Sequence, residues 1–332
     1  MIKIAFDVMG SDKGPKYAIR AAVNFLKKNN DTELHLVGQQ EIIESELKLN
    51  KYKGTNIVIH NATEVIEMTD GILSIRRKTD ASMVVALKLV KEKICDGMLT
   101  SGASAPYIAG CHFILGEFEG ISKPGFMPVI PTEVKGKATA LLDVGANLEN
   151  SPEDLINFAL MANIYMIEIM GNENPKIGLL NIGEEKSKGL PLQVETYKLL
   201  EARNDVNFIG NVEGYEIFTN KADIIVSDGY SGNIMLKTME GAAKSVSRII
   251  SGHVKKNIFR KILAIPLIPA FKGAKKHLDV REYGGAILLG VDGIAFKAHG
   301  SSDEVGFAAT ITMVHQAISR EVLSKMKAKL GK

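Results

Sequence analysis

The sequence contains no tryptophan, only two cysteines, and no apolar run long enough to cross a membrane. Two cysteines, Cys95 and Cys111, make no disulfide framework in a chain of 332 residues, which favours a reducing compartment. A spanning helix needs about 18 consecutive apolar residues, and no stretch reaches that length. The N-terminus, MIKIAFDVMG, has no basic region before its apolar residues and predicts a first strand rather than a signal peptide. We therefore expect a cytoplasmic protein.

The sequence also has little net charge and no obvious cluster of metal-ligating side chains. The formal net charge of +3 is too small to indicate a nucleic-acid partner. No set of histidine, cysteine or carboxylate side chains has metal-ligand spacing, so no metal is predicted. The turn after the first strand, GSDKGP at Gly10–Pro15, lacks the GxGxxG fingerprint of a dinucleotide site. We expect no cofactor.

What the sequence does contain is an alternation of strand and helix patterns, with 45% hydrophobic and 24% charged residues. This order predicts an α/β fold with a largely parallel sheet covered by helices on both faces. We expect one domain over 1–332 with a protruding helical insertion at 240–282. Strands are predicted at 2–8, 33–37, 56–59, 97–100, 126–131, 138–144, 176–181, 206–210 and 224–226, and helices at 17–28, 41–49, 82–93, 152–170, 192–202 and 305–326.

Four strand-to-helix junctions are rich in small or polar residues: Gly10–Pro15, Ser101–Pro106, Gly183–Gly189 and Asp228–Asn233. Ligands of parallel sheets bind beyond the carboxyl ends of the strands, so these turns are expected along one edge. In the last of them, a buried strand at 224–226 precedes Gly229, Ser231 and Gly232, and helical spacing starts at Ile234. This pattern predicts a phosphate or oxyanion cradle, with a simple tight turn as the alternative.

Two further segments carry candidate groups. Lys188 lies beside Gly189 just before a helix, where its cation would neutralise a phosphate; a solvated lysine beside Glu184 and Glu185 is the alternative. In the glycine-broken segment 283–303, His299, Ser301 and Ser302 are groups that a phosphate or carbonyl oxygen needs, while a core histidine is the alternative for His299. Cys111 and His112 suggest a thiol nucleophile only weakly, because adjacent residues rarely meet as nucleophile and base.

The segment His253–Arg281 is basic at its flanks and apolar at its centre, and Asp279 is its single acid. Pro266 and Pro269 predict two short helices, or a helix and a loop. This composition favours contact with an anionic membrane surface or an acidic protein, with a dimer-interface hairpin as the alternative. The contact residues that we expect are Lys255, Lys256, Arg260, Lys261, Leu263, Ile265, Leu267, Ile268, Phe271 and Lys272.

These motifs resemble those of the bacterial phosphate acyltransferases of phospholipid synthesis, which make acyl phosphate from acyl-acyl carrier protein. The resemblance rests on DVMGSDKGP at Asp7–Pro15, LLDVGAN at Leu141–Asn147, LLNIGEEKSKG at Leu179–Gly189, FIGNVEG at Phe208–Gly214, DGYSGNIMLK at Asp228–Lys237 and YGGAILLGVDGIAFKAHGSSD at Tyr283–Asp303. These motifs keep their order across nearly the whole chain. One turn departs from the pattern: Ser101–Tyr107 reads SGASAPY where the family usually has a SAGNTGA-like turn.

The resemblance implies a three-layer α/β/α fold of the Rossmann-like class, similar to phosphotransacetylases and isopropylmalate dehydrogenases. It also implies a homodimer and a peripheral membrane contact through the 253–281 segment. By motif position, Lys188 corresponds to the family's catalytic lysine and Asn233 to its asparagine. The phosphate site would then include Ser101, Gly229, Ser231, Gly232, His299, Ser301 and Ser302.

The activity that the resemblance implies is attack of inorganic phosphate on the thioester of an acyl carrier protein. Lys188 would orient phosphate and Asn233 would donate to the thioester oxygen. The product would stay near the membrane, where a downstream glycerol-phosphate acyltransferase works. Two alternatives remain: a phosphate acetyltransferase-like enzyme that uses short acyl-coenzyme A, and a membrane-surface scaffold without activity.

Overall fold

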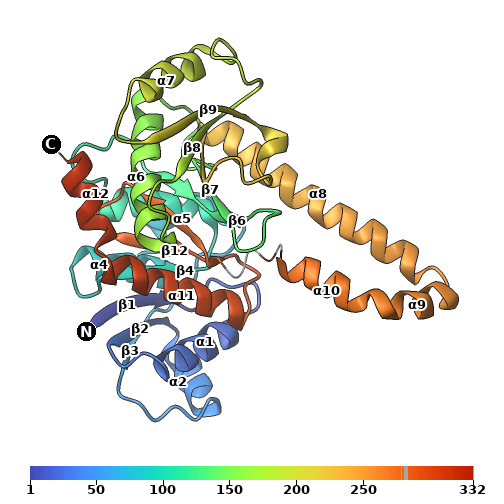
Figure 1. The fold of residues 1–332 in the computed structure, drawn as a ribbon. Helices are drawn as coiled ribbons and strands as arrows, with labels where there is room; N and C mark the ends of the chain where they lie inside the picture. Colours follow the sequence, from blue (N-terminus) through green and yellow to red (C-terminus); the bar gives the residue numbers. More distant parts are fainter. Residues whose placement is uncertain (278, 280–282, 332) are drawn as a thin grey trace.

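Two mostly parallel sheets form the body of the molecule (Figure 1). This computed structural model describes residues 1–277, 279 and 283–331. The first sheet has the order β3 (Ile57–Asn61), β2 (Thr32–Gly38), β1 (Ile2–Asp7), β4 (Gly97–Thr100), β12 (Ile294–Lys297), β11 (Ala286–Leu289) and β5 (Gly125–Met127). The second has the order β6 (Val129–Pro131), β7 (Ala138–Leu142), β10 (Ile224–Val226), β8 (Lys176–Asn181) and β9 (Asn207–Glu213). Antiparallel pairs join β11 to β12 and to β5, and β6 to β7. The predicted α/β class is confirmed.

The two sheets meet where the chain passes from β5 to β6. The sequence predicts one apolar strand over 126–131, but Pro128 separates two short strands that belong to different sheets. Proline has no N–H for a continuous ladder, which fits this crossing point. Leu141 donates its N–H to the carbonyl oxygen of Pro128 at 3.0 Å, a typical hydrogen-bond distance. This bond connects the crossing to the second sheet.

Helices cover both faces of the first sheet. Along β1, Ile4 and Phe6 pack in the core beneath α1 (Lys16–Leu26) and α11 (Glu304–Ser319), while Ala5 faces the core beneath α4 (Ser82–Lys91). This alternation follows the period of two in a strand. The remaining helical elements of this half are α2 (Gln40–Leu49), α3 (Ser74–Arg77), α5 (Ser104–Gly110) and the π-helical turn η1 (Cys111–Leu115).

The second sheet packs on α6 (Pro152–Met170) with one face and on the start of α8 with the other. Helix α6 has the predicted bounds. Ser151 caps it by accepting the N–H of Asp154 at 3.2 Å, and the Asp154 carboxylate accepts the N–H of Ser151 at 2.8 Å. Nearby lie α7 (Pro191–Glu201), η2 (Gly214–Glu216) and the C-terminal α12 (Val322–Leu330).

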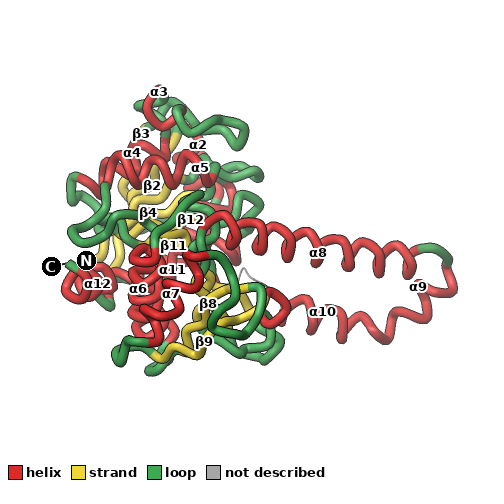
Figure 2. The backbone as a smooth tube through the Cα atoms, turned by 90° about the horizontal axis from the view of Figure 1, so that it is seen from above, coloured by secondary structure: helices red, strands yellow, loops and turns green. Residues whose placement is uncertain are grey.

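A helical arm projects from the body (Figures 1 and 2). The long helix α8 (Gly229–Lys255) runs outward, and α10 (Ile268–His277) runs back beside it. Between them lie α9 (Ile258–Ala264) and the short turn η3 (Ile265–Leu267), within the outer end of the arm at residues 255–272, which we call the tip. The expected end of the insertion at 278–282 lies outside the described residues except for Asp279. That 1–332 form a single domain stays a prediction. Within the described part of the chain, no helix combines the length and apolar character needed to cross a bilayer.

Besides the single strand over 126–131, two further local predictions are wrong. The segment Gly229–Asn233 is the first turn of α8 rather than a loop, because Asp228 caps the helix one residue before Gly229. The closing helix predicted over 305–326 is two helices. The chain breaks at Glu321, which has a left-handed φ of 55° between α11 and α12.

Candidate active site

The start of α8 is held tightly against the loop that follows β7. A Cβ atom on Gly229 would overlap the carbonyl oxygen of Asn147, and a Cβ atom on Gly232 would overlap that of Asp143. These glycines therefore permit close approach of helix and loop, where the sequence pattern indicated close approach of a ligand. Close approach does require glycine at these positions, but what approaches is the backbone of the loop after β7.

The first N–H groups of α8 are largely occupied within the protein. Asp228 accepts from Ser231 N–H at 2.8 Å, and Asn150 accepts from Gly229 N–H at 3.2 Å. Gln193 of α7 contacts the Asp228 carboxylate at 3.4 Å, so α7, α8 and the loop after β7 converge here. In this arrangement the helix start is capped, and side chains rather than these N–H groups remain to contact a ligand.

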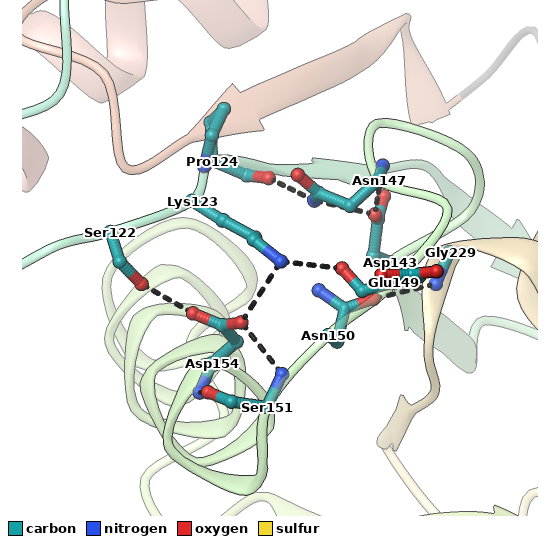
Figure 3. A network of polar contacts seen from close by, with 10 residues as sticks. All are labelled: Ser122, Lys123, Pro124, Asp143, Asn147, Glu149, Asn150, Ser151, Asp154 and Gly229. Carbon is teal, nitrogen blue, oxygen red and sulfur yellow. Dashed lines mark hydrogen bonds and ion pairs between the residues drawn. The ribbon is translucent and has the colours of Figure 1, made fainter.

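The loop under α8 is itself fixed by Asp143, whose carboxylate accepts N–H groups from Phe126, Gly145, Ala146 and Asn147. Burial raises the pKa of Asp143, and these donors oppose the shift. Figure 3 shows that Asn147 extends this cluster to the Pro124 carbonyl. Nearby, Asn150 accepts the N–H of Gly229, and Lys123 bridges the Glu149 carbonyl and Asp154. The network positions the helix that carries Asn233.

Next to this start lies a cavity of about 290 Å³ between α8, the β5–β6 crossing and the segment 284–306. One wall is apolar and comes from the crossing, Phe218 and α8. The other wall is polar and comes from β12 and the loop that follows it. The lining residues are Ser104, Phe126, Pro128, Val129, Ile130, Pro131, Phe218, Leu236, Lys237, Met239, Glu240, Ala243, Gly284, Gly285, Ala286, Lys297, Ala298, His299, Ser302 and Gly306.

The predicted residue His299 lies in the polar wall. The backbone N–H of Ser301 donates to its Nδ1 at 3.2 Å, and the Ser301 hydroxyl lies 2.9 Å from the same nitrogen. Because a backbone N–H can only donate, Nδ1 accepts and Nε2 carries the proton of the neutral ring. Desolvation and the nearby Lys297 lower the pKa of His299. Among the residues that the structure describes, none bonds to Nε2, so this N–H is a donor suited to a carbonyl or phosphate oxygen.

Lys297, at the end of β12, is a cavity residue that the sequence analysis missed. Burial lowers its pKa to about 8, and Lys237 contributes to the shift. Its ammonium donates to the carbonyl oxygen of Ala298 at 3.2 Å, which is its one hydrogen bond within the described residues. A partly desolvated cation with spare donors is a binding group for an anion. The sequence signal was its position in the apolar run GIAFKAHG, next to His299.

The predicted Asn233 does not line the cavity, but it lies one helical turn before Leu236 and Lys237, which do. Residues three and four apart share a helix face, so Asn233 continues the cavity-facing side of α8 toward the body. Its side chain is exposed and lies beside Gly145, where an added Cβ atom would be 3.2 Å from the Asn233 Cβ. Its place beside the cavity fits the role expected of it, and that role stays a prediction.

The remaining predicted residues fall in three places. Ser302 lines the cavity and is buried, and Ser301 contacts His299. Ser101 is buried beside the start of α5, and its hydroxyl has no partner among the described residues. Lys188 is exposed on the loop between β8 and α7, 3.9 Å from Glu185, and lies outside the lining of the cavity.

The weak thiol hypothesis gains no support, since burial raises the pKa of the Cys111 thiol and His112 pairs with Glu117 at 2.6 Å. At the arm, the expected contact residues lie on α8, α9, η3 and α10, away from the cavity. Leu263 is 75% exposed and Ile265 57% exposed, which is unusual for large apolar side chains and marks the tip as a surface that another body can cover.

Comparison with known proteins identifies the family of the chain and supports its fold. The family model described as "Fatty acid synthesis protein" matches residues 2–325. A protein named phosphate acyltransferase from Mesoplasma florum is 51% identical over 331 residues, covering 100% of both chains. One of the same name from Clostridium tetani is 40% identical over 330 residues, covering 99% of this chain and 98% of the other.

Solved structures support the architecture. A phosphotransacetylase from Streptococcus pyogenes matches with a TM-score of 0.61 at 18% identity, covering 97% of this chain and 94% of the other. A branched-chain phosphotransacylase from Enterococcus faecalis V583 matches with a TM-score of 0.58 at 13% identity, covering 96% and 99%. At such identities the likeness concerns the fold alone.

The fold and the family match define an α/β enzyme of the acyltransferase class. The chain belongs to the phosphate acyltransferase family of fatty acid and phospholipid synthesis, as the sequence motifs predict.

Proposed function

We propose that this enzyme transfers a long-chain acyl group from acyl-acyl carrier protein to inorganic phosphate. The observation that carries the proposal is the cavity with one apolar and one polar wall beside Asn233. An apolar wall suits a fatty acyl chain, and a wall with Lys297 and His299 suits the anionic group that receives it. The products are acyl phosphate and the free carrier thiol.

In the proposed step, a phosphate oxygen attacks the carbonyl carbon of the thioester. The new C–O bond forms, the C–S bond breaks, and the sulfur leaves as a thiolate that takes a proton from solvent. At neutral pH phosphate is largely a dianion and needs no strong general base. The work left to the enzyme is to hold two anionic reactants together and to stabilise the developing oxyanion.

We assign Asn233 as a donor to the thioester oxygen and Lys188 as the cation that orients phosphate. His299 offers Nε2–H to the same site, and Ser301 and Ser302 hold the loop that carries it. Gly229, Ser231 and Gly232 build the start of α8 that presents Asn233, since their N–H groups bond within the protein or lie in the helix. Of the predicted site residues, His299 and Ser302 line the cavity, and Ser101 is buried outside that lining.

The test is incubation of the purified protein with hexadecanoyl-acyl carrier protein and phosphate, with acyl phosphate and free carrier thiol measured by mass spectrometry. We expect both products in equal amounts, and neither without phosphate. Thioester loss that does not depend on phosphate would overturn the proposal. No thioester loss at all would favour the alternative of a scaffold without activity.

A second candidate, transfer from a short acyl-coenzyme A, is favoured by the fold shared with phosphotransacetylases. The same assay distinguishes the two when acetyl-coenzyme A and hexadecanoyl-acyl carrier protein are compared as donors. We expect the carrier protein thioester to be preferred. A higher kcat/KM with acetyl-coenzyme A would replace the first proposal by the second.

We further propose that the tip, defined as residues 255–272, contacts an anionic membrane surface. Its exposed apolar side chains would enter the headgroup region, and Lys255, Lys256, Arg260, Lys261 and Lys272 would pair with lipid charge. The enzyme would then be cytoplasmic and peripherally attached, and its product would form near a downstream glycerol-phosphate acyltransferase.

The membrane test is flotation with vesicles that contain phosphatidylglycerol. Leu263→Asp should release the protein from the vesicles. Leu49→Asp is the matched control, because Leu49 is 73% exposed and Leu263 75%, but Leu49 lies at the end of α2 in the body. Equal flotation of both variants would contradict the assignment of the tip.

The same basic residues give a second expectation. Acyl carrier proteins are acidic, so Lys255 to Lys272 would steer them by long-range attraction that salt screens within about 10 Å at 0.1 M. Activity with the carrier protein substrate should fall as ionic strength rises. Activity that is independent of salt would count against carrier steering while leaving the transfer reaction intact.

We also propose a homodimer formed along the arm. Val246, Ile249 and Ile250 recur at helical spacing on α8 and are 55%, 60% and 43% exposed, so they form an apolar stripe that a second copy can cover. Sedimentation should give a dimer for the natural chain and a monomer for Ile249→Glu. A natural chain that sediments as a monomer at all concentrations would end this proposal.

A further inference from the structure

Helix α8 offers two different stripes to the cavity. Leu236, Met239 and Ala243 recur at helical spacing and share the apolar wall with the β5–β6 crossing. Leu236 and Met239 also pack on the core of the second sheet, on which Ile130 lies. Lys237 and Glu240 recur one position later and face the opposite wall, where their charges act on Lys297 and His299. Helix α8 therefore contributes side chains to both the apolar and the polar wall of the cavity.

Within the described residues, Lys297 on the polar side has no carboxylate at ion-pair distance, although Asp12 and Glu240 act on it from farther away and oppose the lowering of its pKa. Lys237 and Glu240 neutralise each other through a contact of 3.1 Å. Lys297 bonds to the backbone carbonyl of Ala298 and, within the described residues, forms no ion pair. The polar wall thus has one spare positive charge from Lys297, beside the Nε2–H of His299. An anionic or oxyanionic head group is what this wall can bind.

The apolar wall needs a different partner. Its side chains offer no charge and few hydrogen bonds; they come from Phe126, Pro128, Val129, Ile130, Pro131, Phe218, Leu236, Met239 and Ala243. Phe218 is 39% exposed, so the wall opens to solvent at one side and an extended chain can enter. A flexible hydrocarbon chain fits such a wall because it gains burial without needing polar partners.

We propose that this cavity is the acyl-chain site, with the chain on the Leu236–Met239–Ala243 stripe and the acyl phosphate head against Lys297 and His299. Helix α8 then limits the length of chain that the enzyme accepts. This inference rests on the proposed transfer reaction and adds to it the place of the chain and a residue, Lys297, that binds the head. The lowered pKa of Lys297 fits this place, since an arriving phosphate restores the charge that burial disfavours.

Chain length is tested with Ala243→Phe, which fills the apolar side, against Ala242→Phe. Both alanines are exposed on α8, but Ala242 does not line the cavity. The measurement is kcat/KM for octanoyl, dodecanoyl and hexadecanoyl donors. For Ala243→Phe we expect loss of the longest donors, about fourfold for each methylene that is excluded, since burying a methylene is worth about 0.8 kcal/mol. Ala242→Phe should keep the natural profile.

The head group is tested by calorimetric binding of hexadecylphosphonate, a stable analogue of the product. Lys297→Met should weaken binding at least about tenfold, and Lys297→Arg should retain most of it because the charge remains. Hexadecanol, which has the chain but no anionic head, should bind the natural enzyme and Lys297→Met equally.

The outcomes distinguish failure of the proposed transfer reaction from failure of the proposed acyl-chain site. If no donor yields acyl phosphate, the proposed function fails. If acyl phosphate forms and Ala243→Phe shows the natural chain-length profile, the acyl-chain site is wrong while the function stands. Equal binding of hexadecylphosphonate by Lys297→Met and the natural enzyme overturns the head-group assignment. Circular dichroism of each variant confirms that the comparison is between folded proteins.

Discussion

Helix α8 contains glycines both at its start and farther out, and their surroundings are opposite. Gly229 and Gly232, at the start, leave no room for a Cβ because the backbone of the loop after β7 lies against them. Gly241 and Gly252, farther out, have nothing within 4 Å of a Cβ position. The start of the helix is part of the packed body that positions Asn233, while the outer part is an arm whose surface faces solvent or a partner. One helix thus connects a tightly packed start, next to the candidate site, to an outer part whose glycines have no close neighbours.

The largest expected effect is at the packed end. Asn233→Ala should lower kcat by about 10²–10³, because a preorganised donor to an oxyanion is worth that much. The measurement is acyl phosphate formation at saturating donor. Thr238→Ala is the control, since Thr238 is exposed on the same helix and does not line the cavity. Full activity of Asn233→Ala would remove Asn233 from the mechanism.

The next effect concerns packing at the same end. Gly232→Ala should destabilise the protein by about 3 kcal/mol, since its Cβ would overlap the Asp143 carbonyl and lie 2.5 Å from Ser227 Oγ. Urea unfolding gives the free-energy change. An alanine variant as stable as the natural protein would mean that the helix start is not held by this loop.

The third effect is a pH dependence in the cavity. The pKa of Lys297 is lowered to about 8, so its charge is present below that pH and is lost as pH rises through it. The value of kcat/KM for phosphate, which reports the free enzyme, should fall about tenfold per pH unit above about pH 8. Lys297→Arg should be flat over the same range because arginine stays charged. A fall shared by both enzymes would assign the titration to another group.

A fourth test compares two lysines of one loop. Lys188→Ala should raise the KM for phosphate about tenfold if Lys188 orients phosphate, as a lost charge-assisted bond implies. Lys186 is the matched control, because it pairs with Glu201 of α7. Equal effects of Lys186→Ala and Lys188→Ala would indicate a general loss of positive charge rather than a site.

The smallest effect is expected in the middle of α8, where a Cβ on Gly241 has nothing within 4 Å. Gly241→Ala should stabilise the protein by up to about 1 kcal/mol, because alanine favours a helix interior and nothing crowds the new methyl group. Thermal unfolding measures the change. Destabilisation would show that the arm is covered at Gly241, for instance by a second copy.

The sequence predicts regular elements well where local signals agree. Ser151 and Pro152 define the start of α6 because a cap and a proline act within one turn. The start of α8 is mispredicted since glycine disfavours helices locally, and only packing against Asp143 and Asn147 explains its use. The division into two sheets at Pro128 is likewise a property of the assembled fold.

The site shows the same limit. The sequence offers His299 and Ser302 as candidates because polar residues at a glycine turn are conspicuous, and both line the cavity, while their roles stay predictions. Lys297 is missed, as one lysine in an apolar run gives no sign of the face on which it lies. The cavity draws its lining from segments that are distant along the chain, so no local pattern contains it. The residue pattern already offered Lys188 as a candidate cation beside Gly189, and the family resemblance added Asn233, which spacing alone does not single out.

The length of α8 has a consequence for how a product travels. Its 27 residues span about 40 Å, so the tip lies roughly 30 Å from Asn233 along the helix. A fatty chain that fills one leaflet of a bilayer reaches about 15 Å. A chain whose head lies beside Asn233 would therefore end short of a membrane at the tip, and the proposed product would have to leave the site to enter the membrane. Delivery would be a relay with a release step, and its speed would depend on the route between the two ends.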